Sequence, residues 1–149
     1  MITFCTLFSG SSGNAVYFAT DQGALLVDCG MSGRQVLDAL CAAGLDPAGL
    51  KALLITHEHS DHVKGVGVLS RRLGLPVYAT EGTWQGMDSA VGELAPQHRI
   101  VIRAGESFFL NDLEIAPFSI PHDAADPVGY RIFARDHSVA VATDLGYFS

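Results

Sequence analysis

The chain has 149 residues, of which 48% are hydrophobic, and its formal net charge is −7 at neutral pH. This length suits one domain, residues 1–149, with a core of its own. No run approaches the roughly 20 apolar residues of a membrane helix, and no basic segment followed by an apolar one opens the chain, so we expect a cytoplasmic protein without a membrane segment. The negative charge argues against broad electrostatic binding of nucleic acid, although bound divalent cations would reverse the charge at a local site.

The first part of the chain predicts three strands and one helix. The strands are expected at 2–7, 15–19 and 24–28, and the turn-rich residues 9–14 join the first two. Ser32 to Gln35 match a capping box that opens a helix, and Gly44 is suited to end it. The three cysteines (Cys5, Cys29 and Cys41) are odd in number and lack a CxxC spacing, which is typical of reduced thiols.

The remaining chain alternates strands and helices and then becomes rich in strands. We expect helices at 65–73 and 81–91, and strands at 52–55, 76–79, 99–103, 107–109, 113–120, 129–134 and 138–143. Strands with interspersed helices predict a layered α/β or α+β domain.

The most informative stretch is Thr56 to His62, which follows the short buried strand at 52–55. Side chains alternate on extended backbone, so His57 and His59 face the same way and can share one cation. Asp61 and His62 come where the chain turns and can reach a second cation. Imidazoles combined with a carboxylate suit zinc-type divalent ions. A solvated polar loop is the alternative, and the concentration of three of the six histidines within six residues argues against it.

Two more residues of ligand type follow apolar strands, namely His122 after 118–120 and Asp144 after 139–142. Each alone is more typical of a turn or a cap. Together with the cluster at 57–62, they indicate a three-histidine site completed by His122 and a carboxylate, Asp144, that bridges two metals.

Other polar residues near these segments have two interpretations. Asp28 could hydrogen-bond a ligating imidazole or could be a turn carboxylate. Glu58 is expected to point away from the metals into solvent. Ser11, Ser12 and Asn14 could contact a phosphate, but a plain hairpin turn is the safer interpretation. Tyr78 and Trp84 are expected in the core.

These motifs together resemble the metallo-β-lactamase superfamily. The resemblance rests on residues 9–15, 26–28, the H-x-H-x-D-H motif at 57–62, His122 and Asp144. The amino-acid sequence at 57–65, 76–84 and 121–130 is similar to that of the YycJ (WalJ) branch, whose bacterial members are described as 5′-to-3′ exonucleases acting on DNA.

The resemblance implies an αββα sandwich and two divalent metal ions. His57, His59 and His122 would hold the first metal, Asp61 and His62 the second, and Asp144 would lie between them. Zinc is favoured by the ligand types, and manganese is the alternative. A metal-activated hydroxide would attack the substrate, with Asp61 also orienting it as the catalytic carboxylate.

The family also has a late histidine ligand that has no counterpart here, since the chain ends five residues after Asp144. We therefore expect a partial domain that lacks most of the second half of the sandwich. The missing half, or a second copy of the chain, is expected to cover the exposed face of its sheet.

The resulting expectation is a metal-dependent hydrolase, in the first instance a phosphodiesterase or 5′-to-3′ DNA exonuclease. One alternative is hydrolysis of a small ester, thioester, lactone or cyclic phosphodiester at the same site. The other is a catalytically incomplete metal-binding fragment.

Overall fold

A computed structural model of the chain describes residues 2–10, 12–121, 123–134, 137–142 and 146–148. Its first sheet has six strands in the order β1-β2-β3-β4-β5-β6. They are β1 (Thr3–Phe8), β2 (Ala15–Thr20), β3 (Gly23–Val27), β4 (Leu50–Leu54), β5 (Val77–Thr80) and β6 (Arg99–Ile102). The pairs from β3 to β6 are parallel. The carboxyl ends of these four strands therefore meet at one edge of the sheet, which is where open parallel sheets place their sites.

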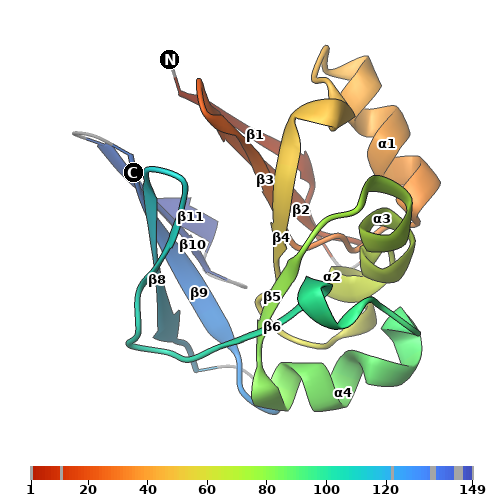
Figure 1. Cartoon of the computed structure of the whole chain (residues 1–149), viewed down its shortest axis with the longest axis vertical. Coiled ribbons are helices and arrows are strands. Elements are labelled where there is room, and N and C mark those ends of the chain that lie inside the picture. The colour runs from red at the N-terminus through yellow and green to blue at the C-terminus, as the bar shows by residue number, and fades with distance from the viewer. Residues whose placement is uncertain (1, 11, 122, 135–136, 143–145, 149) are drawn as a thin grey trace.

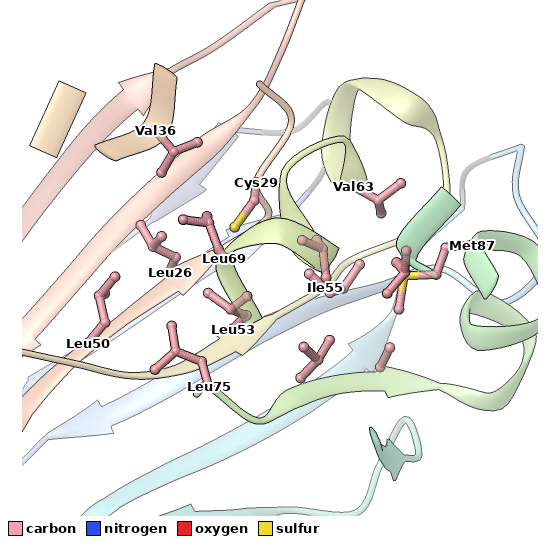
Figure 2. Close-up of a cluster of buried hydrophobic side chains, with 14 of the residues drawn as sticks. Leu26, Cys29, Val36, Leu50, Leu53, Ile55, Val63, Leu69, Leu75 and Met87 are labelled. Atoms are coloured by element: carbon pink, nitrogen blue, oxygen red, sulfur yellow. The ribbon is translucent and has the colours of Figure 1, made fainter. Parts of the chain in front are cut away.

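Helices cover one face of this sheet (Figure 1). They are α1 (Gly33–Ala42), α2 (Ser60–Val63), α3 (Val66–Leu73) and α4 (Glu81–Val91), and short 3-10 turns occur at Pro47–Gly49 and Pro96–His98. The predicted capping box is confirmed, because the Ser32 hydroxyl accepts from the Gln35 backbone and Gln35 caps the Ser32 backbone in return. The apolar cluster between helices and sheet includes Leu26, Val36 and Leu69 (Figure 2).

The second sheet covers the other face of the first (Figure 1). Its strand order is β11-β10-β9-β8-β7, and every pair is antiparallel. The strands are β7 (Phe108–Leu110), β8 (Leu113–Ser119), β9 (Val128–Ala134), β10 (His137–Ala142) and β11 (Gly146–Phe148). One buried cluster joins the two sheets, with Phe18 and Leu54 from the first and Ile115 and Ile132 from the second.

This packing corrects the expectation that a missing half, or a second copy of the chain, covers an exposed face of the first sheet. The inner face of the first sheet is covered by the chain's own second sheet, because strands β7 to β10 pack over it. What the described residues leave uncovered is the outer face of the second sheet, since every described element after β6 is a strand. On that face Phe109 is 66% exposed, and it pairs with Glu114, which in turn pairs with Phe133. The predicted layered α/β sandwich is thus confirmed, while the expectation that most of its second half is missing is wrong for the second sheet, which the chain supplies. Of the expected αββα layers, the described residues do not include the outer helical one.

Most element bounds agree with the predicted ones to within two residues, and α4 begins and ends where expected. Two elements, α2 and β11, were not predicted. The sequence predicted only a turn at Asp61, but four residues from Ser60 form a helical turn. No helix within the described ranges is long and apolar enough to cross a membrane.

Candidate metal centre

Three segments meet at the carboxyl edge of the parallel strands. Asp28 follows β3, Thr56 and His57 follow β4, and α2 carries Asp61 and His62. Backbone hydrogen bonds join these segments, since the Asp28 N–H donates to Leu54 (2.8 Å) and the Cys29 N–H to His62 (2.8 Å). The polar residues of the motif are therefore held on a rigid backbone frame.

Asp28 is the centre of a buried hydrogen-bond network. It is 4% exposed and lies at φ 65°, a left-handed conformation that Asp tolerates better than most residues. Its Oδ1 accepts from the Thr56 N–H (2.8 Å), and its Oδ2 accepts from the Thr56 hydroxyl (2.7 Å). Nδ1 of His62 lies 2.6 Å from the same Oδ2. Of the two interpretations of Asp28, the partner of an imidazole is therefore the one that the geometry supports.

This network assigns the protons on two histidines. A carboxylate only accepts, so His62 carries its proton on Nδ1 and keeps a lone pair on Nε2. The Thr56 hydroxyl has one proton and gives it to Asp28, so its oxygen accepts from Nδ1 of His57 at 2.9 Å. His57 then also keeps its lone pair on Nε2. Both imidazoles are in the tautomer that binds a metal through Nε2.

The histidine rings are packed against one another. The ring centroids of His57 and His59 are 4.5 Å apart, and those of His57 and His62 are 4.0 Å apart. His57 and His62 are buried, and the Asp61 side chain is 31% exposed. Oδ2 of Asp61 lies 3.5 Å from Nε2 of His62. Two ligands of a tetrahedral zinc ion at about 2.1 Å are about 3.4 Å apart, so this pair has the spacing that a shared cation requires.

The structure thus brings together four of the six predicted ligands: His57, His59, Asp61 and His62. The other two, His122 and Asp144, lie outside the described residues. Within the described part of the chain, no group of three or more His, Cys, Asp or Glu side chains is arranged to hold a metal ion. The described residues therefore form part of the predicted ligand set.

Asn14, for which a plain turn was the favoured interpretation and a phosphate contact the alternative, lies beside Asp61 and His62, whereas Ser11 lies outside the described residues. Nδ2 of Asn14 lies 3.2 Å from Oδ2 of Asp61 and 3.1 Å from Nε2 of His62. The same nitrogen donates to the carbonyl of Gly10 (2.9 Å). The only sequence signal was its place at the end of the turn 9–14, which does not distinguish a turn residue from one that reaches the site.

Glu58 differs from its expected position. It is half-buried, and its Oε2 accepts from the backbone N–H of Ala125 at 3.0 Å. The same loop is held by the Thr80 hydroxyl, which donates to the carbonyl of Asp126 (2.9 Å). The expectation of a solvent-facing Glu58 is wrong, because the loop after β8 returns over it.

Two buried groups near the network stay protonated at neutral pH. The Tyr130 hydroxyl donates to the carbonyl of Ile55 at 2.6 Å and so ties the second sheet to the end of β4. Burial, followed by the nearby charge of Asp28, raises the pKa of Tyr130 well above its usual value. The same two causes raise the pKa of the Cys29 thiol. Neither group therefore adds negative charge to the site.

Comparisons with known proteins bear on this arrangement. The family model described as beta-lactamase superfamily domain matches residues 23–149. The exodeoxyribonuclease YycJ of Bacillus anthracis is 40% identical over 98% of this chain and 55% of its own length. The exodeoxyribonuclease WalJ of Streptococcus pneumoniae serotype 2 is 41% identical, with the same coverage of both chains. The chain thus spans about half the length of these curated relatives.

The fold has a counterpart among solved structures. A metallo-β-lactamase of Cronobacter sakazakii superposes with a TM-score of 0.77 at 19% identity and covers 93% of this chain and 58% of its own. At that identity the likeness concerns the fold alone. The resemblance to the YycJ branch and to the metallo-β-lactamase sandwich, both expected from the motifs, is confirmed.

Proposed function

This chain belongs to the beta-lactamase superfamily, and on that premise we propose that it carries the metal site of a hydrolase that cleaves DNA phosphodiester bonds from the 5′ end. The observation that carries the proposal is the proton network at the sheet edge. Asp28 and Thr56 set the tautomer of His57 and His62 in which the proton is on Nδ1 and the lone pair is on Nε2.

The residues present fit a pair of divalent cations. His57, His59 and His122 would hold the first, Asp61 and His62 the second, and Asp144 would bridge them. Zinc is favoured by the imidazole-rich donor set, and manganese is the alternative because carboxylates contribute. When bound, the cations would supply Lewis acidity and a water that is nucleophilic at neutral pH.

The chain's own groups prepare the site for that chemistry. Oδ2 of Asp28 accepts a hydrogen bond from Nδ1 of His62 at 2.6 Å, and the Thr56 hydroxyl oxygen accepts one from Nδ1 of His57 at 2.9 Å. Neither imidazole ring can therefore rotate freely. The Asp61 side chain is 31% exposed, so its second oxygen can orient an attacking water. Neither a serine nor a cysteine nucleophile is needed, and the buried, protonated Cys29 is unsuited to be one.

DNA is proposed as the substrate because relatives that match nearly the whole chain are named exodeoxyribonucleases. The net charge of −7 gives no general attraction for a polyanion. Affinity for DNA would then have to come from the cations and from residues close to them. Three free cysteines suit a reducing compartment, so we place the protein in the cytoplasm.

The test is hydrolysis of end-labelled DNA by the metal-loaded chain. We expect mononucleotides to be released from the 5′ end in the presence of zinc or manganese and no release with chelator. His59→Ala should abolish this activity. His137→Ala is the matched control, because His137 is exposed on β10, far along the chain from the cluster.

Three outcomes separate the candidate functions. A rate that depends on the length and 5′ end of the DNA supports the exonuclease. Turnover of a small ester or thioester, with DNA left intact, assigns the site to small-molecule hydrolysis. Metal binding without turnover of any of these substrates would mean that this chain is a metal-binding part of a larger enzyme.

A further inference from the structure

Asn14 is fixed at the second-metal ligands by its backbone as well as its side chain. Its N–H donates to the carbonyl of Asp61 (2.8 Å), and its own carbonyl accepts from the Gly30 N–H (2.8 Å). Gly30 makes this close approach feasible, because a Cβ there would overlap the carbonyl of Asp61 and the backbone nitrogen of Asn14. The amide of Asn14 is therefore presented to Asp61 and His62 on a rigid support.

The orientation of this amide follows from its neighbours. Nδ2 faces three oxygens that can only accept, namely the carbonyls of Gly10 and Asp61 and the Asp61 carboxylate, at 2.9 to 3.2 Å. Oδ1 instead accepts from the Gly10 N–H at 3.3 Å. The opposite orientation would set oxygen against oxygen, so the donor end of the amide is the end that faces the site.

On His62, the amide uses the one lone pair that a cation would use. A neutral imidazole nitrogen has one lone pair, and Nε2 of His62 offers it to Nδ2 of Asn14 at 3.1 Å. That nitrogen cannot accept this hydrogen bond and ligate a metal at the same time. Oδ2 of Asp61 also accepts a hydrogen bond from Nδ2 of Asn14, at 3.2 Å. Asn14 thus takes the place of a positive charge between the two ligands.

We propose that Asn14 is a place-holder for the second cation, which keeps Asp61 and His62 paired in the metal-free chain and must give up its hydrogen bond to Nε2 of His62 when the cation binds. This inference rests on the proposed metal site. It makes Asn14 a determinant of second-metal affinity, acting against the metal. The tautomer of His62 does not depend on Asn14, because Asp28 already sets it from the other side of the ring.

The experiment is a zinc titration of the whole chain by calorimetry, in competition with a chelator of known affinity. Asn14→Ala removes the amide and keeps both backbone hydrogen bonds. We expect the second zinc to bind about five- to tenfold more tightly, the factor that corresponds to one net hydrogen bond. Asn14→Asp also removes the donor, retains the size of the side chain, and should tighten the second site further. Asn111→Asp, the same chemical change at an exposed turn, should leave it unchanged.

A second measurement separates this role from a structural one. Without metal, Asn14→Ala should melt about 2–4 °C lower than the parent chain, because it loses hydrogen bonds. Lower metal-free stability with tighter zinc binding supports the place-holder. Lower stability with equal or weaker binding of the second zinc would overturn it and leave Asn14 as a positioning residue.

The outcomes also distinguish this inference from the proposed function. One zinc bound by the parent chain and two by Asn14→Ala supports the inference strongly. One zinc in both proteins refutes the place-holder and leaves the first site intact. No zinc in either protein refutes the metal site itself, and the inference with it.

Discussion

Asp28→Asn is the substitution that tests the proton network most sharply. Asparagine has the size of aspartate and tolerates the left-handed φ of 65° found at this position. Its oxygen can continue to accept from the Thr56 N–H, as Oδ1 of Asp28 does at 2.8 Å. Its Nδ2 then replaces the oxygen that accepts from Thr56 and His62, and this nitrogen can only donate.

The expected result is a reversal of both histidine tautomers. Nδ1 of His62 must now accept, so its proton moves to Nε2, the atom needed for the metal, and Nε2 can no longer accept from Nδ2 of Asn14. The Thr56 oxygen accepts from the introduced amide, its hydroxyl turns toward Nδ1 of His57, and the proton of His57 moves to Nε2 as well. Loss of a metal ligand's supporting partner typically costs about 10- to 100-fold in metal affinity.

The cost in stability should be at least as large as the loss in metal binding, because 10- to 100-fold in affinity corresponds to about 1.4–2.7 kcal/mol. Three charge-assisted hydrogen bonds to the carboxylate, each with a contribution of about 1.5–3 kcal/mol, are replaced by neutral ones of about 0.5–1.5 kcal/mol. The expected loss is therefore about 3–4.5 kcal/mol in the free energy of unfolding of the metal-free chain. Asp46→Asn is the matched control, since Asp46 is an exposed cap whose Oδ1 accepts from the Ala48 N–H, and asparagine can do the same.

Nitrogen-15 NMR of the imidazole rings reports the tautomers directly. The metal-free parent chain should have His57 and His62 protonated on Nδ1, and Asp28→Asn should have both protonated on Nε2. Unchanged tautomers together with unchanged zinc affinity in Asp28→Asn would refute the reasoning, because Asp28 would then not set the state of the ligands.

Three further predictions concern the surroundings of the site. Glu58→Ala should lower stability by about 1–2 kcal/mol through loss of its bond to Ala125, and Glu58→Gln should retain most of it; equal losses in urea unfolding would contradict this role. Gly86→Ala should destabilise the chain although alanine favours helices, because its Cβ would lie 2.5 Å from Cγ of Glu58. The penalty should shrink when Glu58 is also replaced by alanine, which removes Cγ and leaves only the Cβ contact at 3.0 Å. Iodoacetamide should modify the exposed Cys41 and spare the buried Cys29, because burial raises the pKa of the Cys29 thiol. The neutral Cys29 thiol stabilises the folded chain at pH values below the pKa that this thiol has in the unfolded chain. This stabilisation is lost as the pH rises above that pKa. Modification of Cys29 in the folded chain at neutral pH would argue against its burial.

Local signals predicted much of the fold. Ser32 and Gln35 predicted the start of α1 through a capping box, because the backbone N–H groups of a first helical turn lack partners within the helix and need such caps. The apolar runs before Asp28 and Thr56 predicted buried strands whose ends share an edge. Local signals did not show that strands β7 to β10 fold back over the first sheet, because this packing depends on long-range contacts rather than on periodicity.

The same limit applies to the site. His57, His59, Asp61 and His62 were predicted because they are close in sequence and follow one strand. Thr56 and Asn14 act through hydrogen bonds to residues elsewhere in the chain: Thr56 bonds to Asp28, 28 residues away, and Asn14 bonds to Asp61. The bond between Thr56 and its neighbour His57 depends in addition on the tautomer of the ring. Local sequence patterns do not reveal such partners. The prediction that Glu58 faces solvent was wrong, because alternation along the strand indicates only the direction of a side chain. It does not show that the loop carrying Ala125 covers Glu58.

The central claim is that the cluster after β4 binds divalent metal, and metal content tests it most directly. The chain purified with zinc and dialysed should retain metal, His59→Ala should lose it, and His137→Ala should keep it. Added zinc should raise the melting temperature of the parent chain and not that of His59→Ala, because a ligand that binds only the folded state stabilises that state. A His59→Ala chain with the same metal content as its parent would contradict the assignment of this histidine and the account built on it.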